Sequence, residues 1–198
     1  MALPYDYYEN NVSGTLTLLQ AMRKAEVSRM VFSSTAAVFG NPLTSLVDED
    51  HPKHPINPYG ASKLMVERIL QDAARAHGLR TVTLRYFNAA GADPSGRIGE
   101  AHEPETHLIP NILRSVLARG AALKVFGDDY ATPDGTCVRD YVHVNDLASA
   151  HLAALDFMRD RNGAHAFNLG NGAGFTVLEV IRAAEQVTGR SIAFDRAP

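Results

Sequence analysis

The sequence has little of what marks secreted, membrane or nucleic-acid-binding proteins. Its single cysteine, Cys137, cannot form an internal disulfide, which fits a reducing compartment. We find no apolar run of membrane-spanning length and no basic-then-apolar leader in the first residues. The 19 lysines and arginines are scattered, and the formal net charge is −3. These absences disfavour membrane and nucleic-acid partners, and we predict a cytoplasmic protein.

The order of helical and strand-like segments predicts an α/β fold. A chain of 198 residues can bury one sizeable core. Apolar periodicity predicts helices over 7–26 and 59–77, each followed by a strand, at 29–34 and 81–88. Alternation of this kind is typical of a parallel sheet with crossover helices.

The second half of the sequence predicts shorter elements separated by long loops. The predicted helices cover 108–119 and 145–158, with a last one opened by a capping-box pattern at 176–179. The predicted strands are 123–126, 138–142, 166–169 and 191–194. Loops of the length predicted over 40–58 and 89–106 are more often functional than idle.

A tyrosine and a lysine lie four residues apart at the start of the helix predicted over 59–77. Asn57 is a favourable N-cap, and Pro58 suits the first helical position. At about 100° per residue, Tyr59 and Lys63 share one half-buried helical face. An ammonium group beside a phenol lowers the phenol's pKa toward a range useful to a general base. The same spacing is also typical of a packing tyrosine beside a lysine that extends over apolar surface.

The apolar sector of this helix is wider than a helix that covers only a sheet requires. Met65 and Ile69 extend it around one flank. We therefore expect a second packing partner for that flank. It is either another helix of the same chain or the equivalent helix of a second subunit, which would make a homodimer through the helices near 11–26 and 59–77.

Polar and aromatic groups gather where the predicted strands end and this helix begins. One strand ends in Ser33-Ser34-Thr35, and another ends in Tyr86-Phe87-Asn88. Ligands of open parallel sheets bind at the carboxyl ends of the strands. A hydroxyl, a tyrosine and a lysine held there suit the interconversion of an alcohol and a ketone. The hydride that leaves the carbinol carbon needs an acceptor that side chains cannot supply, which implies a nicotinamide.

Several ordered motifs resemble one enzyme family along essentially the whole chain. These motifs are Tyr8-Glu9-Asn10-Asn11-Val12-Ser13-Gly14-Thr15, Phe32-Ser33-Ser34-Thr35-Ala36-Ala37-Val38-Phe39-Gly40, Asn57-Pro58-Tyr59-Gly60-Ala61-Ser62-Lys63, Leu84-Arg85-Tyr86-Phe87-Asn88-Ala89-Ala90-Gly91, Asp134-Gly135-Thr136-Cys137-Val138-Arg139-Asp140-Tyr141-Val142-His143-Val144 and Phe167-Asn168-Leu169-Gly170. The sequence is similar to the extended short-chain dehydrogenase/reductase family and, within it, to the UDP-glucose 4-epimerases.

The resemblance implies a fold and a reaction. The fold would be a partial doubly wound, Rossmann-like parallel sheet with part of a small carboxyl-terminal substrate lobe. The sequence reads as one truncated domain, with the Rossmann-like part over about 1–88 and a mixed part over 89–198 that contributes the substrate lobe and returning strands. The reaction would interconvert UDP-glucose and UDP-galactose at sugar C4, through a 4-keto intermediate and tightly bound NAD, as in galactose metabolism.

The resemblance also implies a role for each matching residue. Tyr59 would be the catalytic base, Lys63 its partner and a ligand of the nicotinamide ribose, and Thr35 the hydroxyl on the sugar oxygen and a further cofactor contact. Many relatives have serine where Thr35 stands. Asn10 and Phe87 match cofactor contacts. The residues that match UDP-sugar contacts are Asn88, His107, Leu108, Phe126 and Arg139. We predict no metal ligands.

Three of these residues also suit a different role or depart from the family pattern. An arginine opposite a diphosphate is favourable chemistry, but Arg139 also suits a structural pair with Asp140 or Asp146. Asn10 also fits a helix N-cap. His107 stands where some relatives have asparagine.

Related reactions remain open. A nucleotide-sugar 4,6-dehydratase would have an Asp-Glu pair after the active threonine, where this chain has Ala36-Ala37. The alanine pair therefore favours epimerisation. A UDP-glucuronate decarboxylase shares much of the framework and stays possible.

The family's first strand, glycine-rich turn and helix, which seat the pyrophosphate, are not in this sequence. The glycine-dense segment 170–174 lies far downstream. We therefore expect a chain that begins partway through the fold and stops before its carboxyl-terminal segment. The alternative to an enzyme is a non-catalytic fragment or assembly module that uses the helices at 11 and 59.

Overall fold

The computed structural model describes residues 3–117 and 122–197 and forms two compact units. Unit 1 contains Met1–Phe87 and Asn145–Gly170, and unit 2 contains Asn88–Val144 and Asn171–Pro198. Unit 1 is therefore discontinuous in sequence, because a helix and a strand return to it after the first part of unit 2. No described helix combines the length and the apolar character needed to cross a membrane.

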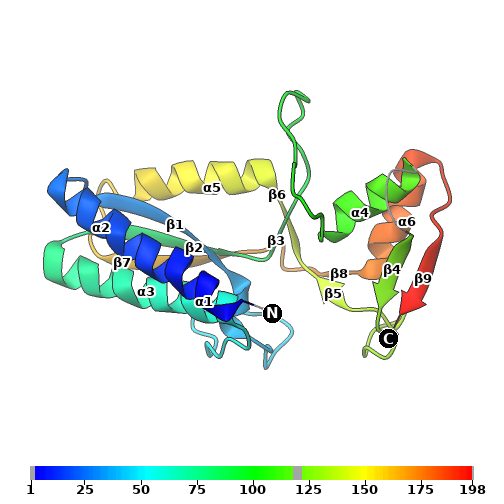
Figure 1. Cartoon of the computed structure of the whole chain (residues 1–198), viewed down its shortest axis with the longest axis horizontal. Helices are drawn as coiled ribbons and strands as arrows, with labels where there is room; N and C mark the ends of the chain where they lie inside the picture. Colours follow the sequence, from blue (N-terminus) through cyan, green and yellow to red (C-terminus); the bar gives the residue numbers. More distant parts are fainter. Residues whose placement is uncertain (1–2, 118–121, 198) are drawn as a thin grey trace. The chain divides into compact units, whose positions relative to one another are not determined.

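Unit 1 is built on three parallel strands in the order β1-β2-β7. They are β1 (Arg29–Thr35), β2 (Arg80–Tyr86) and β7 (Ala164–Leu169). As Figure 1 shows, α2 (Gly14–Lys24) and α3 (Pro58–His77) lie on one side of these strands and α5 (Val144–Phe157) on the other. Helices on both faces of a parallel sheet are the doubly wound arrangement. The predicted α/β, Rossmann-like fold is confirmed.

The two faces of the sheet differ in chemistry because side chains alternate along a strand. Val82 and Leu84 of β2 pack with Ala154 and Met158 in one buried cluster on the α5 side. Arg85, the residue after Leu84, reaches the α3 side, where it meets a carboxylate of that helix. The α3 side also carries an apolar cluster, formed by Phe32, Val66, Leu70 and Leu79.

Helix α3 begins and ends where the sequence predicts. The Asn57 side chain accepts a hydrogen bond from the Gly60 amide at 2.8 Å, which satisfies one of the free N–H groups of the first turn. Pro58 occupies the first turn, and Gly78 ends the helix in the left-handed region with φ of 68°. Both ends of the helix that carries Tyr59 are therefore fixed by local chemistry.

The amino-terminal helical segment is less regular than predicted. In place of one helix over 7–26, the structure has α1 (Pro4–Tyr7), a π-helical segment η1 (Tyr8–Ser13) and then α2. A π-helix is wider than an α-helix and often occurs at functional sites. Asn10 lies inside η1 and is not an N-cap, so that alternative is wrong.

Unit 2 has its own core. The strands β4 (Leu123–Phe126) and β9 (Phe194–Ala197) pair in parallel, and α4 (Leu108–Val116) and α6 (Val177–Thr188) contribute to the same buried cluster. Thr176 is the N-cap of α6 and forms the predicted capping box with Glu179. Two short strand pairs complete the unit, β3 (Asn88–Ala90) with β6 (Tyr141–His143) and β5 (Val138–Arg139) with β8 (Phe175–Thr176).

Three predicted boundaries in this unit are corrected. The strand expected over 138–142 is two strands, because β5 and β6 pair with different partners. The strand expected over 191–194 lies at 194–197, where it pairs with β4. The helix expected to reach 119 is described only as far as Val116, and residues 118–121 lie outside the described residues.

Candidate active site

Thr35 occupies the last position of β1. The chain turns there into a short 3₁₀-helix, η2 (Ala36–Phe39), and the Thr35 hydroxyl accepts a hydrogen bond from the Ala37 amide at 3.1 Å. This bond caps η2 and fixes the side chain's direction. Thr35 is only 8% exposed. Its hydroxyl is therefore held in one place at the carboxyl end of a parallel strand.

Tyr59 and Lys63 reach the same end of β1 from the first turns of α3. A side-chain hydrogen bond joins Tyr59 to Thr35. The Lys63 ammonium donates to the Ser33 carbonyl at 3.0 Å and lies 5.8 Å from the centre of the Tyr59 ring. It also lies 4.9 Å from the centre of the Phe32 ring. The structure thus brings together the three residues predicted to be catalytic.

Burial has the larger effect on the ionisation of this pair. Desolvation raises the pKa of Tyr59, and the hydrogen bond with Thr35 partly opposes it. Desolvation also lowers the pKa of Lys63. The expected lowering of the tyrosine pKa by the ammonium is therefore not found in this structure. The physical reason is that Lys63 is directed at the Ser33 carbonyl.

We expect a spectrophotometric pH titration to detect this burial. Tyr59→Phe should reduce by one tyrosine the tyrosinate signal that appears above the ordinary tyrosine range near pH 10, because burial raises the pKa of both Tyr59 and Tyr141. Tyr5→Phe is the matched control, since Tyr5 is 81% exposed. It should leave this late signal unchanged. A reduced late signal in Tyr5→Phe but not in Tyr59→Phe would contradict the assignment.

A chain of hydrogen bonds supports Tyr59 through its backbone. The Asn11 side-chain amide donates to the Ser62 hydroxyl at 2.9 Å, and that hydroxyl donates to the Tyr59 backbone carbonyl at 2.8 Å. Ser62 is fully buried. The Tyr7 ring packs edge-on against the Tyr59 ring with centroids 6.1 Å apart. The amino-terminal helical segment therefore positions the tyrosine as well as covering the sheet.

Gly60 permits the close approach of α3 to η2. A Cβ atom at Gly60 would lie 2.5 Å from the Ala37 carbonyl oxygen. We expect Gly60→Ala to destabilise the fold by about 1–3 kcal/mol, as overpacking does, and to separate Tyr59 from Thr35. Urea denaturation measures the first effect.

Gly14→Ala is the control for the Gly60 variant. Gly14 begins α2, and an added Cβ atom there would lie 4.0 Å from the Glu9 carbonyl oxygen, which is ordinary contact. Alanine is favoured over glycine in a helix by about 0.5–1 kcal/mol. The control should therefore be neutral or stabilising, and equal losses in both variants would refute the role of close approach at Gly60.

A buried ion pair supports the site and was not singled out from the sequence. The Arg85 guanidinium donates to both carboxylate oxygens of Glu67, with the shortest bond at 2.7 Å, and Ser34 donates to the same carboxylate at 2.6 Å. Both charged side chains are 4% exposed. The sequence does contain a pattern that could have indicated this pair. Glu67 follows Lys63 by one helical turn, and Arg85 interrupts a run of residues typical of a strand.

A histidine from α5 also reaches the end of β1. His151 Nε2 lies 3.0 Å from the Ser33 hydroxyl, and its Nδ1 lies 2.7 Å from the Leu147 carbonyl. A carbonyl only accepts, so Nδ1 carries a proton and donates to Leu147. The sequence offered no signal for this contact, because 118 positions separate the two residues.

The two other predicted cofactor contacts lie on or next to unit 1 elements. The Asn10 amide is exposed and donates to the Asn11 side chain at 3.2 Å. Phe87 is half-buried and directly follows β2. Their assignment to the cofactor stays a prediction.

The residues predicted to bind the UDP-sugar beyond Thr35 and Tyr59 belong to unit 2. Asn88 opens β3 and donates through its side chain to the Asp140 carbonyl at 2.7 Å. Leu108 begins α4 and packs against that unit's core, whereas His107 directly precedes the helix. Phe126 ends β4 and is 62% exposed.

Arg139 is an exposed residue of β5. Its guanidinium donates to the Val138 carbonyl at 2.8 Å, and among the described residues of its own unit it forms no ion pair with Asp140. The Asp140 carboxylate instead accepts hydrogen bonds from the backbone amides of Asn171 and Gly172. The pairing of Arg139 with Asp140 is therefore wrong, because backbone amides of the glycine-dense segment bind that carboxylate.

The comparisons with known proteins agree with this geometry. A family model described as the NAD dependent epimerase/dehydratase family matches residues 1–170. This chain belongs to the NAD dependent epimerase/dehydratase family. The family match covers all the elements of unit 1, including the three residues gathered at the end of β1.

Relatives within the family are UDP-glucose 4-epimerases. The chain is 52% identical over 195 residues to the one from Halalkalibacterium halodurans, covering 98% of this chain and 58% of that protein. The structure is similar to that of the Brucella ovis enzyme in complex with NAD, with a TM-score of 0.95, 47% identity, and coverage of 98% of this chain and 60% of the other. The structure is also similar to that of the Bifidobacterium longum enzyme in complex with NAD+ and UDP, with a TM-score of 0.93, 43% identity, and coverage of 100% of this chain and 59% of the other. The chain thus spans less than two thirds of the length of each.

Proposed function

We propose that this chain carries the catalytic centre of an enzyme that interconverts UDP-glucose and UDP-galactose at sugar C4. The observation that carries the proposal is the hydrogen-bonded Tyr59 and Thr35 beside Lys63 at the carboxyl end of β1. The identity of 52% with a UDP-glucose 4-epimerase supports it.

Each side chain has a task in this reaction. Tyr59 in its phenolate form accepts the proton of the C4 hydroxyl as the carbinol becomes a ketone, and returns it when the ketone is reduced on its other face. Thr35 donates a hydrogen bond to the same oxygen in both directions. NAD, when bound, supplies the acceptor for the hydride from C4. Rotation of the 4-keto sugar between the two steps then inverts the configuration.

The residues present fit the nicotinamide ribose. Lys63 has three N–H donors and, within the described residues, donates only to the Ser33 carbonyl. Its other donors are available to ribose hydroxyls. Tyr59 and Thr35 lie beside it, and Asn10 and Phe87 complete the proposed cofactor contacts.

The proposed contacts to the UDP-sugar in unit 2 are Asn88, His107, Leu108, Phe126 and Arg139. Arg139 suits the diphosphate, because its guanidinium is exposed and has no carboxylate partner among the described residues. The exposed Phe126 ring offers an apolar surface to a base or a sugar.

Ala36 and Ala37 argue against a 4,6-dehydratase. They follow Thr35 directly and form the first turn of η2. Methyl groups cannot move the protons that elimination of water requires. A UDP-glucuronate decarboxylase is the second candidate, since it would use the same tyrosine, lysine and threonine for the oxidation step.

We propose, in addition, a homodimer through α2 and α3 and a cytoplasmic location. Leu16, Leu18 and Met65 are each more than 40% exposed on these helices, which is costly for a surface without a partner. Size-exclusion chromatography with light scattering tests the dimer. Met65→Asp should yield monomers, whereas a dimer that persists would contradict this interface.

The epimerase proposal is tested in a chimera. The 195 residues that match the Halalkalibacterium halodurans relative are replaced in that protein by this sequence. Purified chimera is incubated with NAD and UDP-galactose, and UDP-glucose is expected. Release of carbon dioxide from UDP-glucuronate would favour the decarboxylase, and a folded chimera with neither product would refute both.

A further inference from the structure

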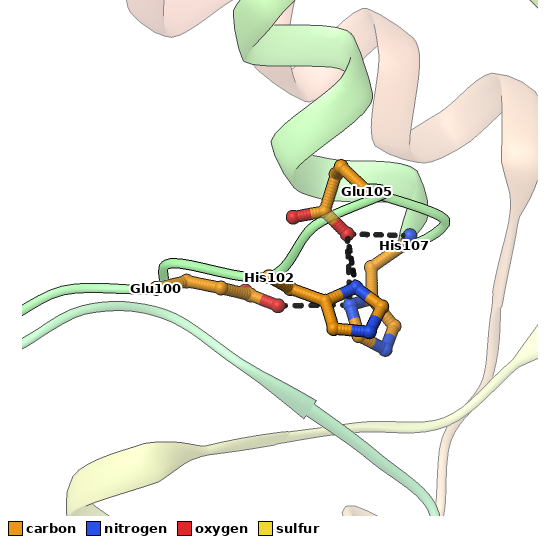
Figure 2. A group of neighbouring side chains, drawn as sticks. All are labelled: Glu100, His102, Glu105 and His107. Carbon is orange, nitrogen blue, oxygen red and sulfur yellow. Dashed lines mark hydrogen bonds and ion pairs between the residues drawn. The ribbon is translucent and has the colours of Figure 1, made fainter.

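Four potential metal ligands converge in the segment that leads into α4. Glu100, His102, Glu105 and His107 each offer one ligand atom, and these atoms lie within 4.8 Å of one another. Figure 2 shows the two imidazole rings side by side, with the two carboxylates directed at them. The ring centroids are 4.9 Å apart. Four groups from eight successive residues therefore surround one small volume.

The close contacts in this cluster outnumber the hydrogen bonds that its imidazole N–H groups can donate. His107 Nδ1 lies 2.8 Å from a Glu100 oxygen and 2.9 Å from a Glu105 oxygen. An imidazole nitrogen carries at most one proton, which points in one direction. The same Glu105 oxygen also lies 3.4 Å from His102 Nδ1. A cation at the centre would satisfy these atoms together.

Charge leads to the same conclusion. With neutral imidazoles the cluster carries two negative charges, and no lysine or arginine forms an ion pair with Glu100 or Glu105 in the described part of the chain. Glu105 is also the most enclosed of the four, with its side chain 2% exposed. Its carboxylate is held by the backbone amides of Thr106 and His107, at 2.9 and 2.8 Å. Such outer hydrogen bonds orient a ligand before a metal arrives.

We propose that Glu100, His102, Glu105 and His107 form a binding site for a divalent transition-metal ion, of which Zn²⁺ fits best. Two imidazole nitrogens and two carboxylate oxygens are ligands of types that zinc uses in tetrahedral sites. Bonds of about 2.0–2.1 Å place tetrahedral ligand atoms about 3.4 Å apart, which small side-chain movements achieve from the present separations. Mg²⁺ and Ca²⁺ fit less well, because they prefer sites made of oxygen ligands.

The metal would fasten the long segment before α4 to that helix. His107 is the N-cap residue of α4 and makes no side-chain cap. Coordination through Nδ1 would fix its ring and leave Nε2, which forms no hydrogen bond within the described residues, free for another ligand. The site shares His107 with the proposed UDP-sugar contacts, but metal binding is measured without substrate and does not depend on the proposed epimerase activity.

Metal binding is tested on the untagged 198-residue chain. After incubation with ZnCl₂ and exhaustive dialysis, mass spectrometry of the metal content should give about one zinc per chain. Titration with Co²⁺ should give the intense visible absorption of tetrahedral cobalt. Circular dichroism and thermal unfolding are recorded for each sample, and zinc should raise the unfolding temperature.

Two conservative variants and one control decide the outcome. Glu100→Gln and His102→Asn should each weaken zinc binding by more than the 10–100-fold typically lost when a residue that only hydrogen-bonds to a ligand is changed. The circular dichroism spectrum of the zinc-free chain should not change. His54→Asn removes an exposed histidine outside the cluster and should bind zinc as the unaltered chain does. Wild-type chain without bound zinc, equal losses in His54→Asn, or full binding in both cluster variants would overturn the proposal.

Discussion

Tyr59→Phe is expected to lower kcat of the chimeric enzyme by about 10²–10⁴-fold, the range typical of losing a general acid–base group. The phenol is half-buried and hydrogen-bonded to Thr35, and Phe keeps its ring and its edge-on contact with Tyr7. The packing of α3 should therefore survive while the proton acceptor is lost. The measurement is the rate of UDP-glucose formation from UDP-galactose at saturating substrate.

Binding separates this effect from a loss of structure. The proposed contacts to the nucleotide lie on other residues. The dissociation constant for UDP, measured by calorimetry, should therefore change less than about threefold, which is well under the ~1.4 kcal/mol of binding free energy that a ten-fold change represents. Tyr7→Phe is the matched control and removes a hydroxyl next to the same ring. Turnover in Tyr59→Phe within tenfold of the unaltered chimera would refute the role of Tyr59 as the base.

Replacing either member of the buried Glu67 and Arg85 pair is expected to give the largest loss of stability, about 3–5 kcal/mol in the free energy of unfolding. Both side chains are 4% exposed, so removing one leaves a charge in a place that water cannot reach. Glu67→Ala also leaves the Ser34 hydroxyl without its acceptor. Urea denaturation of the 198-residue chain, with its midpoint and slope, provides the measurement.

An exposed pair on the same helix is the control. Arg68 and Asp72 are 66% and 56% exposed and 3.3 Å apart, so Asp72→Ala should cost no more than about 0.5 kcal/mol. The double variant with Met at 67 and 85 should lose less than either single alanine variant, because no unpaired charge remains. Equal costs in the buried and exposed pairs would contradict the role assigned to burial.

The sequence by itself determined most of the local elements and predicted the proposed catalytic trio of Thr35, Tyr59 and Lys63. Caps and periodicity act over a few residues, and so Asn57, Pro58 and Gly78 were sufficient to predict the bounds of α3. The motifs around Thr35, Tyr59 and Lys63 were sufficient to predict membership of the family that the comparisons found. Short-range chemistry of this kind is encoded in adjacent residues.

The tertiary structure alone decided what joins residues distant in sequence. Burial under the neighbouring elements raises the pKa of Tyr59, whereas the sequence predicted a lower one. The Lys63 ammonium donates a hydrogen bond to the Ser33 carbonyl. The buried Glu67 and Arg85 pair and the His151 contact also depend on long-range packing. The physical reason is that desolvation and hydrogen-bond partners arise only when strands and helices pack, and no single segment specifies its neighbours.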